Sequence, residues 1–401
     1  MITFLTAGES HGPKLTGIIE GIPAGFSLNI DAINHDLFRR QQGFGRGGRM
    51  KIENDQVKIT AGYQNNLTTG APLALEIENI DYKNWVDKSI DPMIIPRPGH
   101  ADYVGAHKYE HEDLRISLER SSARETAMRT AIGSICKQLL QEFNIQILAY
   151  AIQIGGIKSD TQIATEELHR KWYDISLKNE FAFIDENKLV EIKEYINKVM
   201  KQKDTLGGVF EVAALNLPIG LGSYVHYHHR LDGQIAQAMM SIPAMKAVEI
   251  GNAIANSSLL GTKVHDEFKL NQDGSITRLS NRAGGLEGGV SNGMPVVTKV
   301  YMKPISTTLT PLQSIDLVNK NIAPTVYERS DFCALPRAVV IGEAMMAFVI
   351  FNALAQKLGG DSKKAMLRHF DSIPKAHVDS FCLDRKSTRL NSSHTDISRM
   401  P

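Results

Sequence analysis

Two segments about a hundred residues apart carry residue types that could hold a phosphorylated ligand beside a proton donor. The first is Gly8-Glu9-Ser10-His11-Gly12, and the second is Arg120-Ser121-Ser122-Ala123-Arg124-Glu125-Thr126 at the expected start of a helix. Helix N-termini bind anions, and histidine exchanges protons near neutral pH. The two segments predict an active site assembled from distant parts of the chain. Simple N-capping by Ser121 or Ser122 would equally explain those hydroxyls.

Residues 39–51 form a second candidate anion-binding segment. They read Arg-Arg-Gln-Gln-Gly-Phe-Gly-Arg-Gly-Gly-Arg-Met-Lys, with no acidic residue. Glycines let the backbone approach an anion closely, and arginine binds phosphate or carboxylate through paired N–H groups. A flexible, solvated basic loop is the alternative interpretation.

Three further segments could contribute to the same site. His100 lies in the turn Arg97-Pro98-Gly99-His100-Ala101-Asp102, where it could act as an acid or base or be merely structural. The glycines of 284–289 precede Lys303-Pro304-Ile305-Ser306-Thr307-Thr308, a combination that suits phosphate or a planar cofactor but also occurs in ordinary turns. Arg329-Ser330-Asp331 is either part of a site or a surface ion pair.

The three neighbouring histidines do not predict a metal site. His226, His228 and His229 lack a carboxylate partner and lack the helical spacing of common metal ligands. We therefore expect no metal.

The elements that must position these residues are a mixture of helices and strands. Apolar periodicity predicts helices at 123–143 and 186–203, and β-branched stretches predict strands at 145–154, 209–217 and 294–302. The apolar run 338–358 carries Glu343 and ends at two glycines, which favours a buried helix over a membrane span. The order lacks a regular βαβ rhythm, and no dinucleotide or Walker motif follows a strand. The expected fold is α+β, in a single domain with long functional loops.

Composition excludes several classes of protein. The 401 residues are 42% hydrophobic and 22% charged, as in a soluble globular protein. The net charge of +1 argues against a broadly basic nucleic-acid binder. Three scattered cysteines fit neither a disulfide framework nor a zinc site, and no secretory signal is visible, so we expect a cytoplasmic protein.

Several of these segments, in this order and spacing, resemble the signatures of the chorismate synthase family. They are residues 8–23, 97–102, 119–129 and 329–343, and the resemblance extends from Met1 to the low 380s. It implies a monofunctional lyase that converts 5-enolpyruvylshikimate 3-phosphate to chorismate and phosphate, with reduced FMN required but not consumed. NADPH could serve as a reductant, and an external source would supply the reduced flavin. The implied fold is a β-α-β sandwich of two antiparallel sheets around helices, assembled as a homotetramer.

The implied chemistry agrees with the residue types. Phosphate is lost from C3 and hydrogen from C6, and because no carbonyl activates that hydrogen, a side-chain base alone would face a poor acid. An electron lent by the reduced flavin would solve this difficulty. Substrate and FMN are both anionic, which explains local arginine clusters in a nearly neutral chain.

The resemblance also implies roles for individual residues. His11 would protonate or electrostatically support the reduced flavin, His100 would be a general acid, and Asp331 would assist proton removal. Positions that correspond to FMN-contacting segments are Arg120, Ser121, Ser122, Pro243, Ala244, Gly288, Lys303, Pro304, Ile305, Ser306, Thr307 and Arg329. Arg40 and Arg46 match positions assigned to NADPH or to the anionic groups of the substrate. Many relatives have Asn or Gln at the position of Pro243, so only backbone contact with the flavin is expected there.

The end of the chain departs from the family. Residues 1–384 form the expected domain, whereas 385–401 change to a polar Ser/Thr/Asn/Arg mixture that is typical of disordered or non-native sequence.

Two other functions fit parts of the sequence less well. A Gly/Arg-rich RNA-binding module would need aromatic platforms, but residues 39–51 offer only Phe44, so no nucleic-acid partner is expected, nor a membrane. An NADPH-dependent oxidoreductase would need a nicotinamide-binding fingerprint, which the sequence lacks.

Overall fold

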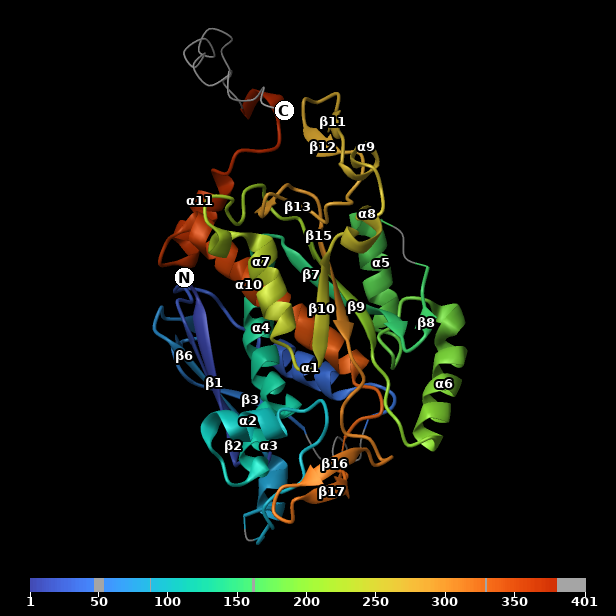
Figure 1. Cartoon of the computed structure of the whole chain (residues 1–401). Helices are drawn as coiled ribbons and strands as arrows, with labels where there is room; N and C mark the ends of the chain where they lie inside the picture. The colour runs from blue at the N-terminus through green and yellow to red at the C-terminus, as the bar shows by residue number, and fades with distance from the viewer. Residues whose placement is uncertain (47–53, 87, 161–162, 329, 381–401) are drawn as a thin grey trace, which may run out of the picture.

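The structure is a computed structural model, and it describes residues 1–401 except 47–53, 87, 161–162, 329 and 381–401. Two antiparallel sheets dominate it (Figure 1). The first sheet has the strand order β1 (Thr3–Ala7), β2 (Lys14–Glu20), β6 (Leu73–Glu78) and β3 (Val57–Ala61). The second has the order β10 (Met245–Ile250), β15 (Val296–Met302), β9 (Gly208–Leu215), β7 (Gln146–Ile154) and β8 (Ile157–Lys158). The mixed helix-and-strand fold class is confirmed.

Shorter strands form four separate pairs. They are β4 (Tyr63–Gln64) with β5 (Leu67–Thr68), β11 (Phe268–Leu270) with β12 (Ile276–Arg278), β13 (Leu286–Glu287) with β14 (Val290–Ser291), and β16 (Gln313–Asp316) with β17 (Asn321–Pro324). The α-helices are α1 (Ile30–Gln41), α2 (Asp102–Tyr109), α3 (Leu114–Ser121), α4 (Thr126–Gln141), α5 (Glu166–Ser176), α6 (Leu189–Lys201), α7 (Leu231–Met240), α8 (Ala253–Asn256), α9 (Gly261–Val264), α10 (Leu335–Leu358) and α11 (Lys363–Asp371). The 3₁₀ turns are η2 (Ile80–Asn84), η3 (Ala123–Glu125), η4 (Glu186–Lys188), η5 (Tyr227–His229) and η6 (Val378–Ser380).

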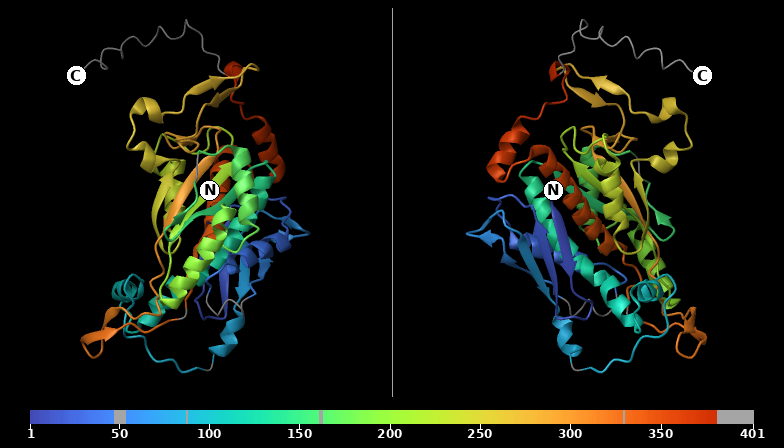
Figure 2. Two further views of the ribbon diagram at one scale, coloured as in Figure 1. Left: turned by 90° about the vertical axis from the view of Figure 1, so that its right-hand side faces the viewer. Right: turned by 60° about the vertical axis from the view of Figure 1, so that its left-hand side comes forward.

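Helices α4 and α10 connect the two sheets. They contact each other, α4 also contacts β2 and β6, and α10 contacts β7 and β9 (Figures 1 and 2). Residues Met128, Ile132, Ile135 and Leu139 of α4 are buried, as their helical spacing predicted. The two helices approach so closely that a Cβ added at Gly133 would lie 2.3 Å from the Cβ of Ala344. A glycine at this position therefore permits the contact.

Helix α10 confirms the buried helix expected near 338–358. It is apolar on nearly every side, and Pro336 occupies its first turn, where a missing N–H costs nothing. Gly359 follows its last residue with φ +60°, a backbone conformation that suits glycine. Of the described helices it alone is long and apolar enough to cross a membrane, but 83% of its most apolar window is buried inside the protein.

Glu343, the acid inside that apolar run, belongs to a buried ion network. Arg39 Nη2 donates to Glu343 Oε2 at 2.8 Å, and Lys137 Nζ contacts both Glu343 and Asp36. Burial alone would raise the pKa of Asp36, but Lys137 and Arg39 lower it below its ordinary value. Since each charge has a partner, this network joins α1, α4 and α10.

The other predicted elements lie close to their expected bounds. Strands β7, β9 and β15 correspond to the predicted stretches 145–154, 209–217 and 294–302. The helix expected over 186–203 begins as η4 and continues as α6, which buries Ile192, Ile196 and Val199. The helix expected at 123–143 begins as η3, so its α-helical part starts only at Thr126.

Candidate functional site

The described residues enclose one large cavity, of about 1200 Å³, between the loop after β1, the junction of α3 and α4, the start of α10 and the loops that precede α2 and follow β15. It is large enough for two ligands of moderate size. Basic groups dominate its charged lining: His11, Arg40, Lys83, Lys88, Arg97, His100, Arg124, Lys303 and Arg337, against Asp81, Glu328 and Asp331. We call this cavity the basic pocket, and its charge suits anionic ligands.

His11 is held at the pocket wall by Glu119, at the end of α3. The Glu119 carboxylate accepts a hydrogen bond from His11 Nδ1 at 2.6 Å and another from the His11 backbone N–H at 2.8 Å. The imidazole also packs on Trp85, with 3.8 Å between ring centroids. Burial would raise the pKa of Glu119, but the hydrogen bonds from His11 lower it. Because a carboxylate can only accept, Nδ1 of His11 carries the shared proton, and Glu119 fixes the orientation of the ring.

His100 is held in the same way by Asp102, the first residue of α2. His100 Nδ1 donates to Asp102 Oδ1 at 2.6 Å, and Arg97 Nε donates to Asp102 Oδ2 at 2.8 Å. Asp102 is fully buried. Burial would raise its pKa, yet the hydrogen bonds from His100 and Arg97 lower the pKa of this carboxyl well below its usual range. An ionised Asp102 thus fixes both the histidine and the arginine.

Arg97 connects this group to the opposite wall. Its Nη1 donates to Thr307 Oγ1 at 2.8 Å, and Lys303 Nζ donates to the carbonyl oxygen of Gly99 at 2.6 Å. Burial and the neighbouring Lys246 lower the pKa of Lys303. Hydrogen bonds therefore join the turn 97–102, which carries His100, to the segment 303–308 after β15. Both segments were predicted separately as parts of the site.

A second set of charges lies near α10. Arg337 Nη2 pairs with Asp331 Oδ2 at 2.9 Å. The buried Nε of Arg337 has no hydrogen-bond partner among the described residues. A buried donor without a partner is costly, so a bound anion would satisfy it. The donor set of the basic pocket thus fits phosphate- and carboxylate-bearing groups.

The structure brings most of the predicted site residues to the basic pocket. Its lining includes His11, Arg40, His100, Ser121, Ser122, Pro243, Ala244, Lys303, Ile305, Ser306, Thr307 and Asp331. Arg329 lies outside the described residues. The roles assigned to these residues remain predictions, because a position in the wall does not identify a ligand.

Four predicted residues are not among the described residues that line the pocket. Arg120 turns toward β1, where its Nη2 donates to the carbonyl oxygen of Thr6 at 2.8 Å. Arg46 Nη1 donates to the carbonyl oxygen of Gln41 at the end of α1, and Pro304 does not face the cavity. Gly288 lies in the tight turn between β13 and β14, where Gly288 and Gly289 have φ values of +60° and +83°. For these two glycines the ordinary-turn interpretation accounts for the sequence.

The expected helix start at 120–126 needs correction. Arg120 and Ser121 form the end of α3, and Ser121 Oγ donates back to the carbonyl oxygen of Ser117 at 2.6 Å. Ser122 is extended and caps η3, accepting from the Arg124 N–H at 3.4 Å. Helix α3 is too short to be recognised from the sequence. The end of α3 and the start of η3 therefore meet at the point where the N-terminus of a single helix was expected.

Arg40 lines the pocket, but most of its donors serve the protein. Its Nη2 donates to the carbonyl oxygen of Ala123 at 2.8 Å and to Thr126 Oγ1 at 3.0 Å, and only 1% of the residue is exposed. It therefore supports the junction between η3 and α4 as much as it faces the cavity.

Sequence reasoning did not single out several residues of the pocket. The pocket lining includes Ser10, Trp85, Arg97, Arg124 and Arg337, while Asp102 and Glu119 hold its histidines from behind; all but Trp85 stood inside predicted segments but were given no role of their own. Asp102 had a local signal, because it lies two residues after His100 in the same rigid turn. Trp85 had none, since only the folding of the chain brings it near His11. Arg337 lay in the predicted segment 329–343, but its pairing with Asp331 was not predicted.

Comparisons with known proteins all indicate one family. The family model described as "Chorismate synthase" matches residues 2–355. The chain is 47% identical over 398 residues to the chorismate synthase of Aquifex aeolicus (strain VF5), covering 95% of this chain and 99% of that protein. It is 45% identical over 385 residues to that of Solibacter usitatus (strain Ellin6076), covering 93% and 98%. A solved structure described as "Crystal Structure of Chorismate Synthase" has a TM-score of 0.77 and 40% identity, covering 92% of this chain and 96% of that one.

Proposed function

This chain belongs to the chorismate synthase family of lyases in the shikimate pathway, and from that premise we propose that the basic pocket converts 5-enolpyruvylshikimate 3-phosphate to chorismate and phosphate. The observation that carries the proposal is the pair of histidines, His11 and His100, each fixed by a carboxylate in a cavity of about 1200 Å³ lined mainly by basic groups. The reaction is an anti-1,4-elimination. The C3–O and C6–H bonds break, a new double bond forms, and the substrate undergoes no net oxidation.

The residues of the basic pocket fit reduced FMN as a cofactor. Its phosphate and ring would be contacted from Ser121, Ser122, Ala244 and the segment 303–307, and the buried Nε of Arg337 offers a donor to an anionic group. Reduced FMN, when bound, would supply an electron transiently and recover it, so the reaction would require it without consuming it. Arg329, Arg120, Pro304 and Gly288 belong to the same proposed set by position in the family motifs.

The chain's own groups would manage the protons. His100, with Nδ1 held by Asp102, would present Nε2 as a general acid toward the departing phosphate. His11, held by Glu119, would support the reduced state of the cofactor. Asp331 would assist proton removal, with Arg337 fixing its carboxylate. Arg97, Arg124 and Lys303 would orient the anionic substrate and keep it in place.

Several finer features also remain proposals. Arg40 and Arg46 would bind NADPH or substrate anions, with NADPH as one reductant and an external source of reduced flavin as another. The two sheets would form the β-α-β sandwich of the family, which the contacts of α4 with β2 and of α10 with β7 support. The enzyme would be cytoplasmic and would have no nucleic-acid or membrane partner. It would form a homotetramer, and sedimentation velocity would measure the mass of that assembly.

One anaerobic experiment tests the function. The purified protein is mixed with chemically reduced FMN and 5-enolpyruvylshikimate 3-phosphate, and chorismate absorbance and phosphate release are followed together. We expect equal amounts of both products over many turnovers, with the flavin still reduced at the end. Oxidised FMN in place of reduced FMN is the control and should give no product. Absence of chorismate, or flavin oxidation in step with product, would refute the proposal.

A further inference from the structure

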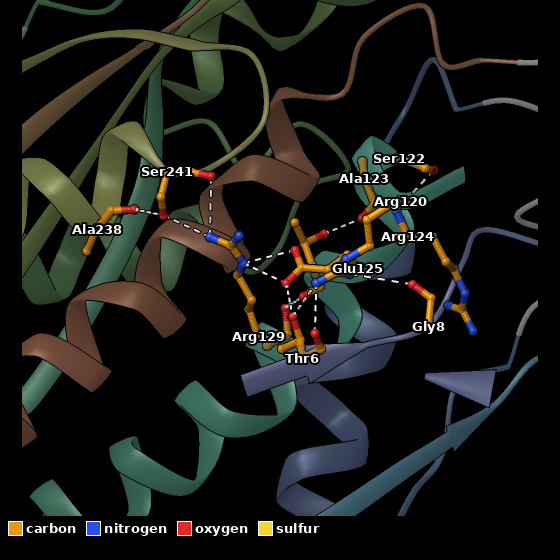
Figure 3. Close-up of polar contacts among 12 residues, drawn as sticks. Thr6, Gly8, Arg120, Ser122, Ala123, Arg124, Glu125, Arg129, Ala238 and Ser241 are labelled. Atoms are coloured by element: carbon orange, nitrogen blue, oxygen red, sulfur yellow. Dashed lines mark hydrogen bonds and ion pairs between the residues drawn. The ribbon is translucent and has the colours of Figure 1, made fainter. Parts of the chain in front are cut away.

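A chain of hydrogen bonds runs from strand β1 to the turn between α7 and β10 (Figure 3). Thr6 Oγ1 donates to Glu125 Oε1 at 2.6 Å, and Arg129 Nε donates to both oxygens of the same carboxylate at 2.9 and 3.0 Å. Arg129 Nη1 then donates to Ser241 Oγ at 2.8 Å and to the Ser241 carbonyl oxygen at 3.3 Å. Ser241 Oγ donates in turn to the carbonyl oxygen of Ala238 at 2.6 Å. Segments far apart in sequence are thus joined through one arginine.

The ion pair at the centre of this chain is shielded from solvent. The side chains of Arg129 and Glu125 are only 19% and 9% exposed. Charge-assisted hydrogen bonds are stronger than neutral ones, and partial burial protects them from screening by salt. The pair Arg170–Glu166 on α5 has the same i,i+4 spacing, but its side chains are 40% and 34% exposed.

The turn that Ser241 introduces is strained. The Met245 N–H donates to the carbonyl oxygen of Ile242 at 3.2 Å, which closes a four-residue turn with Pro243 second and Ala244 third. Ala244 has φ +71°, the left-handed region that the third position of a type II turn requires and that glycine normally supplies. A non-glycine residue remains in this conformation only when its surroundings hold it there.

That turn forms part of the basic pocket. Ile242, Pro243 and Ala244 all line the cavity, and the Ala244 carbonyl oxygen accepts from the N–H of Lys303 at 3.0 Å. Arg129 itself is not among the described residues that line it. The arginine therefore acts on the pocket wall from behind.

The same chain reaches the segment that carries His11. Arg120 Nη2 donates to Thr6 Oγ1 at 3.0 Å, and Arg120 Nη1 donates to the carbonyl oxygen of Gly8 at 3.4 Å. Figure 3 shows these contacts continuing from Glu125 through Thr6 and Arg120 to Gly8. Two walls of the basic pocket are thus connected outside the cavity, one beside His11 and the other at Ala244.

We propose that Arg129 is a positioning residue that holds the strained turn 242–245 in place as a wall of the basic pocket. The identity of the ligands it helps to admit rests on the proposed function, whereas the hydrogen bonds themselves do not. The role requires the guanidinium, because one group must reach Glu125 and Ser241 at the same time.

Hydrogen exchange on the ligand-free protein gives the direct test. The variants are Arg129→Met and, as matched control, Arg170→Met, which also breaks an i,i+4 ion pair but on α5. We expect the amides of Met245 and Lys303 to exchange about tenfold faster in R129M, the effect of losing one charge-assisted hydrogen bond. Neither amide should change in R170M. Equal exchange of these amides in R129M and in the wild-type protein would overturn the proposal.

Ser241→Ala covers the case in which R129M does not fold. It removes the shorter of the two contacts with Arg129 and leaves the carbonyl contact, so a smaller acceleration at the same amides is expected. Unchanged exchange in a folded S241A, with R129M unfolded, would also count against the proposal.

Ligand binding supplies a second readout. Titration calorimetry with reduced FMN should show a dissociation constant about tenfold higher in R129M than in R170M. Arg129→Lys should restore little of the affinity for reduced FMN, because lysine lacks the paired N–H groups of the guanidinium. Equal dissociation constants in the two variants would refute a role in forming the pocket. If the wild-type protein made no chorismate, the proposed function would fail, but the exchange result would still decide the role of Arg129.

Discussion

Each of the two pocket histidines has one ring nitrogen fixed by a carboxylate. Glu119 holds Nδ1 of His11, and Asp102 holds Nδ1 of His100. Both arrangements place a proton on Nδ1, and both set the direction of the ring. A histidine whose proton lies on a known nitrogen is a better acid or base than one that rotates freely.

Replacing either histidine should impair catalysis more than binding. His11→Ala and His100→Ala should each lower chorismate turnover by about 10²-fold or more, the usual scale for acid-base groups. Reduced FMN should still bind, because other lining residues supply most of the contacts. Stopped-flow turnover and flavin titration measure the two quantities separately. Near-normal turnover in either variant would exclude its assigned role.

Asp102→Asn should change both activity and the pH dependence of stability. The folded protein lowers the pKa of Asp102, so its ion pair contributes fully above the ordinary value of 3.8 and is lost as pH falls toward the lower folded value. Removing one partner of a buried pair should cost about 3 kcal/mol near neutral pH. Turnover should fall as well, because His100 loses its anionic partner.

Chemical unfolding at several pH values checks this prediction. The difference between wild-type and D102N unfolding free energies should be constant above about pH 5 and should shrink from about pH 4 to pH 2. A difference that grew on acidification would show that Asp102 is not the stabilising carboxylate.

Residue types alone indicated the basic pocket but not its internal pairing. His11, His100 and Lys303 stood out in the sequence because glycine, proline or hydroxyls surround them. Glu119 and Arg337 did not, since an acid and an arginine beside helical segments are usually solvated. Glu119 matters because it holds His11, which is 108 residues away in the sequence. Arg337 matters because it pairs with Asp331, and sequence spacing alone predicts neither contact.

At the level of elements, the contact between α4 and α10 is the tightest test of the fold. An alanine Cβ at position 133 would lie 2.3 to 2.4 Å from the Cβ, Cα and carbonyl oxygen of Ala344. Gly→Ala within a helix normally stabilises by up to about 1 kcal/mol, but overpacking costs about 1–3 kcal/mol. Because the clash involves backbone atoms, we expect overpacking to prevail and Gly133→Ala to lower the unfolding free energy.

Gly156→Ala is the matched control for that substitution. A Cβ at Gly156 would meet nothing within 4 Å, so its effect should stay within about 0.5 kcal/mol. Urea denaturation of the two variants gives both values. Equal stabilities for G133A and G156A would mean that α4 and α10 lie farther apart than described.

Elements with strong patterns were the easiest to predict. Helix α10 and strands β7, β9 and β15 are mostly apolar and buried. Their apolar residues can therefore be recognised in the sequence without knowing which elements pack against them. Helix α3 was missed because it has only eight residues, too few for a clear apolar periodicity. Short elements depend on tertiary contacts more than on their own propensity.

For the whole molecule, the polar segment at 385–401 should be dispensable. The described lining of the basic pocket extends from Ser10 to Ile341, and the family model matches residues 2–355. Deleting 385–401 should therefore leave chorismate turnover within about twofold and the melting temperature unchanged within about 2 °C, because the expected domain ends at residue 384. Turnover assays and calorimetry measure both. A large loss of either would show that this segment belongs to the domain of residues 1–384.

The sequence by itself determined the family, the main buried elements and the segments that carry His11, His100 and Lys303, because local motifs and apolar periodicity record them directly. The tertiary structure alone decided which groups meet. In the folded chain Arg120 contacts β1, Gly288 lies in the turn between β13 and β14, and Arg129 lies behind the part of the basic pocket that Ala244 lines. Hydrogen bonds depend on distances of about 3 Å between atoms, and only packing of the whole chain fixes such distances between residues far apart in sequence.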